Sequence, residues 1–133
     1  MFSPLRLKTS RESKKISLND FDSIKNLGSG KYGKVFLARH KETNFIGAIK
    51  IVEKKLIMEE NIVEQFIREL KIQNFLNHPN VVRLYGFFDD EVNIYVLMEA
   101  CMDGELLKKL KRDLNMSEKK AALIMKQVCS AVN

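Results

Sequence analysis

The sequence is organised around residues 27–50, which read LGSGKYGKVFLARHKETNFIGAIK. Three glycines in this stretch, Gly28, Gly30 and Gly33, follow a G-x-G-x-x-G spacing. Because glycine has no Cβ, a backbone with this spacing can turn tightly and approach a phosphate closely. The spacing alone is a weak signal, since dinucleotide-binding folds share it. In those folds, however, the glycines follow a strand and open a helix.

The residues after the glycines predict strands and not a helix. Residues 35–40 alternate in the manner of a strand, residues 41–44 read as a polar turn, and residues 45–52 are rich in Ile, Ala and Val. A strand, a glycine loop, a strand, a turn and a strand that carries Lys50 form a hairpin flap suited to covering a phosphate. The alternative is a glycine-containing hairpin with a surface lysine and no ligand.

The remaining sequence predicts further strands over residues 21–27, 81–88 and 93–98. Between the third and fourth strands, apolar residues recur every three or four positions over residues 62–76, which is typical of an amphipathic helix. Residues 53–55 read as a charged connection before this helix. Pro79 ends it, because proline disfavours helical geometry in the preceding residue. The expected fold class is α+β, with one helix packed on a five-stranded antiparallel sheet.

Two more helices are expected after a short connector. Residues 105–112 carry leucines at helical spacing, and Ser117 has the properties of an N-cap, with Glu118 in the first turn. The second helix is expected to carry one apolar stripe. The stripe comprises Ala121, Ile124, Met125, Val128 and Val132.

Glu69 shares a predicted helix face with Ile62 and Phe66, and this face should turn toward the sheet. A carboxylate on an inward face is costly unless a cation meets it. Lys50 is the natural partner, so an ion pair between Lys50 and Glu69 is expected. The alternative is a glutamate at the edge of the stripe that reaches solvent.

Composition limits the class of protein. The 133 residues are 45% hydrophobic and 30% charged, which is typical of a globular chain of one domain or part of one. No apolar run approaches the roughly 20 residues that span a bilayer. The cysteines, Cys101 and Cys129, form neither a disulfide framework nor a metal site, and their scarcity indicates a reducing intracellular setting.

The net charge of +6 is partly concentrated in the first fifteen residues. Residues 1–18 are expected to be a disordered, solvated leader. Nucleic-acid binding by this leader is a weak hypothesis, because no aromatic residues interleave with its basic ones.

A specific set of motifs resembles eukaryotic protein kinases. The set comprises Gly28-x-Gly30-x-x-Gly33-x-Val35, Ala48-x-Lys50, Glu69, His78-Pro79-Asn80 and a hinge after Met98. Within that family the chain is most similar to the Aurora serine/threonine kinases, over residues 36–39, 68–73 and 77–88. Gln73 stands where most kinases carry an apolar residue and Aurora kinases carry Gln. Residues 98–104, which read MEACMDG, depart from the Aurora hinge, and Glu99-Ala100-Cys101 with Gly104-Glu105 resembles polo-like kinases.

The resemblance implies a division of the chain and a nucleotide site. Residues 19–98 would form the kinase small lobe, residues 99–104 the hinge, and residues 105–133 the start of a truncated large lobe. The catalytic residues would be Lys50, which binds the α and β phosphates, and Glu69, which holds it. The implied nucleotide-binding residues are Leu27, Gly28, Ser29, Gly30, Lys31, Tyr32, Gly33, Val35, Ala48, Lys50, Met98, Glu99 and Cys101.

The implied roles follow the motifs. The glycine loop would cover the ATP phosphates, while Leu27, Val35 and Ala48 would pack on the adenine. The backbone of Glu99 and Cys101 would hydrogen-bond the adenine edge. These two residues belong to the hinge, and Met98 would be the gatekeeper behind it.

The resemblance implies an ATP-dependent serine/threonine protein kinase that uses Mg²⁺. The sequence holds neither the His-Arg-Asp loop nor Asp-Phe-Gly, so this chain is expected to be an inactive fragment whose Mg²⁺ ligands lie in the missing large lobe. The alternative is a non-catalytic kinase-like module that binds nucleotide or a protein partner.

Partners and location are also implied. We expect a protein substrate and an activating protein on the small-lobe surface near residues 62–66 and 85–88, with no membrane partner and no nucleic acid. The expected location is the cytoplasm, the nucleus or the spindle.

Overall fold

The computed structural model describes residues 15–113 and 116–133. Most of the predicted leader, residues 1–14, lies outside the described residues. The described part contains a short 3-10 helix, η1 (Leu18–Asp20), which leads into the first strand. No helix among the described residues is both long and apolar enough to cross a bilayer.

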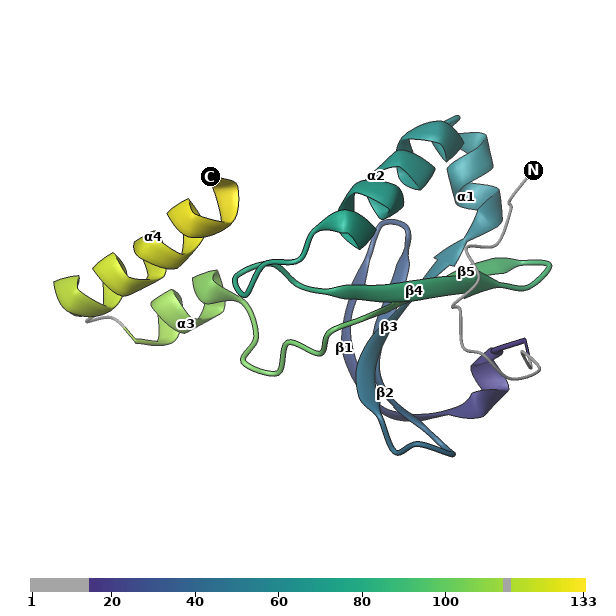
Figure 1. Cartoon of the computed structure of the whole chain (residues 1–133), viewed down its shortest axis with the longest axis horizontal. Coiled ribbons are helices and arrows are strands. Elements are labelled where there is room, and N and C mark those ends of the chain that lie inside the picture. The colour runs from purple at the N-terminus through teal and green to yellow at the C-terminus, as the bar shows by residue number, and fades with distance from the viewer. Residues whose placement is uncertain (1–14, 114–115) are drawn as a thin grey trace.

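Five strands form one antiparallel sheet in the order β1-β2-β3-β5-β4, which confirms the predicted α+β fold (Figure 1). The strands are β1 (Phe21–Gly30), β2 (Gly33–His40), β3 (Ile46–Glu53), β4 (Leu84–Asp89) and β5 (Asn93–Met98). Only β4 begins well away from its predicted start. Its pairing with β5 starts at Leu84, opposite Met98, because Val81 is still in a turn, where its backbone N–H bonds the carbonyl of His78.

Two helices, not one, connect β3 to β4: α1 (Lys54–Glu59) and α2 (Val63–Phe75). The predicted helix corresponds to α2 and ends close to where it was expected. The sequence analysis missed α1 and treated its first residues as a charged connection. This helix spans only six residues and buries only Ile57, so it is too short to show a helical period.

The sheet has an apolar core on each face. Successive residues of β5 belong alternately to the two cores, because successive strand side chains point to opposite faces. Ile94 and Val96 pack with Ile57 of α1 and Leu70 of α2. Tyr95 packs on the other face, where its ring stacks on Phe88 at 5.0 Å between centroids. Helices α1 and α2 therefore cover the same face of the sheet.

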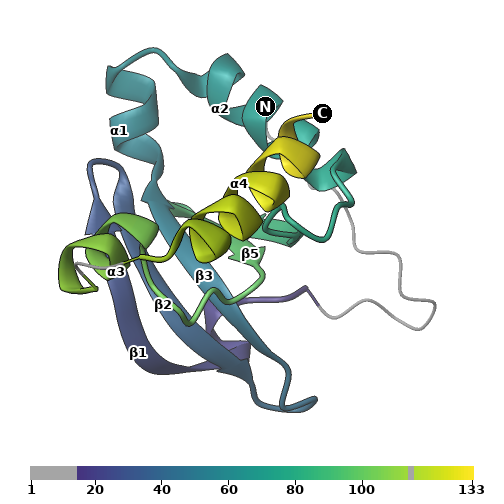
Figure 2. The ribbon, with the colours of Figure 1, turned by 90° about the vertical axis from the view of Figure 1, so that its left-hand side faces the viewer.

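The last two helices, α3 (Leu106–Arg112) and α4 (Glu118–Val132), lie to one side of the sheet (Figures 1 and 2). Ser117 caps α4 as predicted, since its hydroxyl accepts a hydrogen bond from the backbone N–H of Lys120. The expected apolar stripe of α4 is only partly packed, since Ala121 and Ile124 are half-buried. Met125 and Val132 are 57% and 83% exposed, because the sheet core does not extend under this helix.

Candidate functional site

The register of the sheet places four predicted site residues on one face. Val35 is paired with Lys50, and Ala48 is paired with Met98. Directly paired residues point to the same side of a sheet, so these four side chains share a face. Lys50 is also paired with Val96, which belongs to the core under the helices. Lys50 therefore projects from the helix-covered face, in line with the apolar residues.

The structure gives different reasons for glycine at the three positions of the loop. A Cβ built on Gly33 would lie 1.7 Å from the carbonyl oxygen of Ile51. The fold itself thus requires glycine at Gly33. A Cβ on Gly28 or Gly30 would meet nothing within 4 Å. The first two glycines leave open space beside the backbone, as a loop that receives a ligand at close range needs.

The loop between β1 and β2 is held at its tip. The ammonium group of Lys31 lies 2.6 Å from Oε1 of Glu60, and the hydroxyl of Tyr32 donates a hydrogen bond of 2.7 Å to Oε2. The Lys31 ammonium and then the Tyr32 hydroxyl hold the pKa of the Glu60 carboxyl below its usual range. The Glu60 carboxylate, followed by the Tyr32 side chain, raises the pKa of Lys31. A single carboxylate thus contacts two consecutive residues of the glycine loop.

The expected ion pair between Lys50 and Glu69 is not formed. Within the described part of the chain, no oxygen of Glu69 lies within 4.0 Å of the Lys50 ammonium. Glu69 is exposed and instead accepts a hydrogen bond of 3.0 Å from the Gln65 side chain. The helix turns Leu70 into the core, which leaves Glu69 on the exposed side. The expectation of an inward-facing carboxylate was therefore wrong for this conformation.

The segment after β5 connects the sheet to the last helices. The backbone N–H of Glu99 donates to the carbonyl of Arg83 at 2.8 Å, and the Glu99 carboxylate accepts from the Arg83 backbone N–H at 3.1 Å. These bonds fix the first hinge residue beside the start of β4. Cys101 is exposed, whereas Leu27 and Met98 are half-buried.

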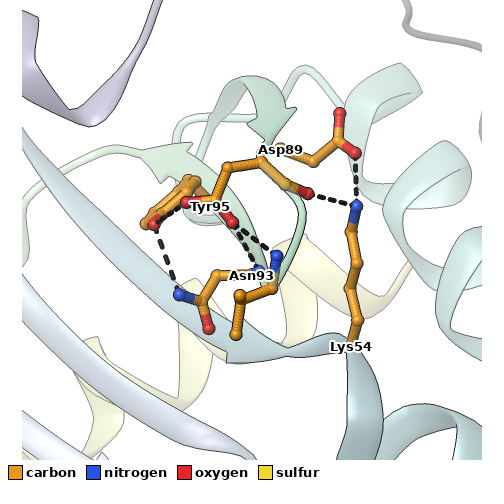
Figure 3. A network of polar contacts seen from close by, with 6 residues as sticks. Lys54, Asp89, Asn93 and Tyr95 are labelled. Atoms are coloured by element: carbon orange, nitrogen blue, oxygen red, sulfur yellow. Dashed lines mark hydrogen bonds and ion pairs between the residues drawn. The ribbon is translucent and has the colours of Figure 1, made fainter.

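Sequence reasoning missed Glu60 because nothing in residues 56–61, which read LIMEEN, distinguishes it from the neighbouring Glu59. It also missed a polar network at the β4–β5 turn (Figure 3). The Asp90 carboxylate accepts bonds from the Tyr95 hydroxyl at 2.6 Å and from the backbone of Asn93 at 2.7 Å. Lys54 lies 2.6 Å from Asp89 and also bonds the Asp90 carbonyl. An aspartate run before a strand predicts a turn, but it does not predict which lysine meets it.

These contacts shift two pKa values at the turn. The hydrogen bond from Tyr95, followed by that from the Asn93 backbone, lowers the pKa of Asp90. Burial, followed by the bond to Asp90, raises the pKa of Tyr95. The turn is thus most stable with Asp90 charged and Tyr95 protonated.

Neither of two open hollows on the described surface includes a predicted nucleotide-site residue. One lies at the end of α4, beside Val128 and Val132, and the other along the outward side of α2, beside Ile67 and Phe75. Among residues 15–113 and 116–133, no group of three or more His, Cys, Asp or Glu side chains is arranged to hold a metal ion. The described site is therefore a sheet face and a loop.

Comparison with known proteins gives a family match over most of the chain. Residues 21–133 match the protein kinase domain family. The chain is 48% identical to an Aurora kinase of Saccharomyces cerevisiae over 98 residues, which cover 74% of this chain and 27% of the relative. It is 40% identical to an Aurora kinase of Candida glabrata over 127 residues, 96% of this chain and 36% of the relative.

A plant relative gives the same result. The serine/threonine-protein kinase Aurora-1 of Arabidopsis thaliana is 40% identical over 119 residues, which cover 90% of this chain and 40% of the relative. The chain thus spans about a third of the length of the curated relatives it matches.

Proposed function

Since the chain belongs to the protein kinase domain family and is Aurora-like within it, we propose that it carries the ATP-binding part of a serine/threonine protein kinase. The whole protein would transfer the γ-phosphoryl group of ATP to a serine or threonine hydroxyl of a protein substrate. Residues 19–98 would act as the small lobe, residues 99–104 as the hinge, and residues 105–133 as the first part of the large lobe.

One observation carries the proposal. Val35, Ala48, Lys50 and Met98 share one sheet face, at the end of which lies a loop with open space beside Gly28 and Gly30. An apolar face suits a planar base, and a cation beyond it suits a phosphate chain. The residues present therefore fit the nucleotide that the family implies.

Each group has a defined role in this proposal. Lys50 would supply positive charge to the α and β phosphates, and the backbone N–H groups of the loop would bind phosphate oxygens. Leu27, Val35 and Ala48 would pack on the base, with Met98 behind it. The backbone of Glu99 and Cys101 would hydrogen-bond the base edge. Mg²⁺ would neutralise phosphate charge, and we assign it no ligand in this chain.

In this structure Lys50 lacks its expected carboxylate partner. We infer that Glu69 would serve catalysis only after α2 moves so that Glu69 approaches Lys50. A partner protein bound at the small-lobe surface is one source of such a movement. The likeness to Aurora kinases supports a site of action inside the cell.

The test is nucleotide binding by the expressed chain, measured by isothermal titration calorimetry with ATP and Mg²⁺. Lys50→Ala should weaken binding by about 10- to 100-fold, because a charged hydrogen bond to phosphate is lost. Lys34→Ala is the matched control. Lys34 is paired with Ile51 and therefore lies on the opposite face of the sheet. Equal effects of the two substitutions would contradict the proposal.

A further inference from the structure

A carboxylate outside the predicted site contacts the glycine loop. Glu60 is the C-cap of α1, and it meets Lys31 and Tyr32 of the loop through separate oxygens, at 2.6 and 2.7 Å. We call these three residues the loop clasp. The contacts join residues that lie almost thirty positions apart, so local sequence does not dictate them. They link the tip of the β1–β2 hairpin to the corner between α1 and α2.

The corner that carries Glu60 is rigidly built. The backbone N–H of Asn61 bonds the carbonyl of Met58, and that of Ile62 bonds the carbonyl of Ile57, both at 3.1 Å. Asn61 has a φ of 54°, in the left-handed region. This pattern is a Schellman motif, which ends a helix with a fixed reversal of the chain. Ile57 is 1% exposed and Ile62 packs in the same core, so the backbone of Glu60 is anchored.

The other end of α1 is anchored too. Lys54 begins the helix, and its ammonium group contacts Asp89 and the carbonyl of Asp90 at the β4–β5 turn (Figure 3). The backbone N–H of Lys54 also bonds the carbonyl of Val92 at 2.9 Å. Helix α1 is therefore a short strut, fixed to the sheet at its first residue and to the core at its last turn.

The loop side of the clasp is also constrained. Tyr32 is half-buried and packs against the core under the helices, beside residues such as Val52. Gly33, the next residue, fits tightly against the Ile51 carbonyl. Lys31 is held on the side of Glu60, where its ammonium charge is already matched. Gly28 and Gly30, by contrast, have open space around them.

From this geometry we infer that Glu60 is a positioning residue for nucleotide binding, because it fixes the tip of the glycine loop through Lys31 and Tyr32. The inference rests on the proposed function, since it assigns the loop to the phosphates. A loop that is already ordered loses less conformational entropy when a ligand binds. Glu60 would thus raise nucleotide affinity without touching the nucleotide. The negative charge of Glu60 acts in the opposite direction, by repelling phosphate, but its pairing with Lys31 offsets this repulsion.

The experiment compares Glu60→Gln with Glu59→Gln. The control removes the same charge from the same helix, but Glu59 pairs with Lys55 and does not contact the loop. Hydrogen exchange of residues 29–34 is measured first in the full chain without nucleotide. Exchange in Glu60→Gln should be about threefold faster than in the wild type, the size of effect expected when an exposed ion pair is lost. Glu59→Gln should leave the exchange unchanged. Tyr32→Phe, which removes only the hydroxyl, should give a smaller increase.

A charge swap tests the ion pair directly. Lys31→Glu combined with Glu60→Lys restores an opposite pair in reversed order, so the double variant should recover at least half of the lost protection. Equal exchange in Glu60→Gln and Glu59→Gln would overturn the inference.

Nucleotide affinity gives the second readout. Glu60→Gln should weaken ATP binding by about two- to fivefold, the range expected when an exposed ion pair is removed. An unchanged or higher affinity would overturn the positioning role and show that repulsion dominates. If the wild-type chain fails to bind ATP, the proposed function fails, but the exchange comparison in nucleotide-free protein still decides whether Glu60 holds the loop.

Discussion

The glycine-loop side and the α2 side of the proposed nucleotide site differ in the contacts that their glutamates form. On the loop side, Glu60 contacts two residues of the glycine loop, and Gly33 is fitted against the Ile51 carbonyl. On the helix side, the Glu69 carboxylate accepts a hydrogen bond from Gln65 and, among the described residues, forms no ion pair with Lys50. Both glutamates lie in the helical connection between β3 and β4. The difference teaches that the length of a helix does not decide how well its side chains are positioned. The short helix α1 is fixed at both ends and holds Glu60 against the loop, whereas the longer helix α2 leaves Glu69 exposed.

The largest effect is expected from a substitution that disrupts the packing of α2. Leu70 is 8% exposed and packs with Val52, Ile57 and Val96. Leu70→Ala should lower the free energy of unfolding by about 3 kcal/mol, because it removes buried carbons and leaves a cavity. Urea denaturation measures the loss. Ile72→Ala, on the 54% exposed side chain of the same helix, is the control and should cost less than about 1 kcal/mol.

The next effect concerns the loop side. Gly33→Ala should lower the free energy of unfolding by about 2 kcal/mol, because the new methyl group overlaps the Ile51 carbonyl and forces the hairpin apart. Gly30→Ala should change it by less than about 0.5 kcal/mol, since its site is open. Thermal unfolding compares the two. A similar cost for both would refute the distinction between a glycine needed by the fold and one left free for a ligand.

A smaller effect is expected at the β4–β5 turn, which anchors the first residue of α1. Tyr95→Phe should lower the free energy of unfolding by about 1 kcal/mol, because Asp90 loses its shortest hydrogen bond. The same variant should also show slightly faster hydrogen exchange in residues 29–34, since α1 connects the β4–β5 turn to the loop clasp. An unchanged exchange rate would mean that the turn does not support the loop.

The pH dependence of this anchor has a definite sign. The pKa of Asp90 is lowered in the folded state by Tyr95 and the Asn93 backbone, so its contribution is complete above the ordinary aspartate pKa of about 4 and is lost as pH falls through the folded value. The pKa of Tyr95 is raised, so its contribution is complete below about 10 and is lost as pH rises above that. Urea denaturation between pH 2 and 7 should show a smaller acid loss in Asp90→Asn than in the wild type.

The smallest expected effect is at Glu69. Glu69→Gln should change the free energy of unfolding by less than about 0.5 kcal/mol, because the carboxylate is exposed and pairs with no cation within the described residues. The measurement is a urea titration at neutral pH. A loss above 1 kcal/mol would show that Glu69 meets Lys50 in solution and would remove the contrast between the two sides.

The sequence was sufficient to predict a five-stranded antiparallel sheet with Lys50 near the end of its third strand. Residues 35–40 and 93–98 are short segments bounded by turn signals, and short connections join β2 to β3 and β4 to β5 as antiparallel hairpins. The pairing of β3 with β5 joins strands far apart in the sequence, so no local signal predicts it. The Lys50–Glu69 pair could not be predicted reliably. Helical spacing places Glu69 near Phe66 on the helix surface, but it does not fix how the helix is rotated against the sheet.

Other features had no usable sequence signal. Helix α1 is shorter than two helical turns, so no periodicity marks it. The loop clasp depends on side chains that meet across the fold, and any of the four glutamates of residues 53–64 was an equal candidate from the sequence. Residues 116–133 gave a correct N-cap at Ser117, but Met125, Val128 and Val132 of the predicted stripe are exposed in the described part of the chain.

The central claim is that the face carrying Lys50 and the open part of the glycine loop receive the phosphates of a nucleotide. The most direct test is an NMR titration of the isotopically labelled chain with ATP and Mg²⁺, followed through backbone amides. We predict that the largest shifts fall on Gly28, Gly30, Val35 and Lys50, with smaller shifts in residues 98–101. Shifts confined to α4 or to the outward side of α2, with the glycine loop unaffected, would contradict the claim.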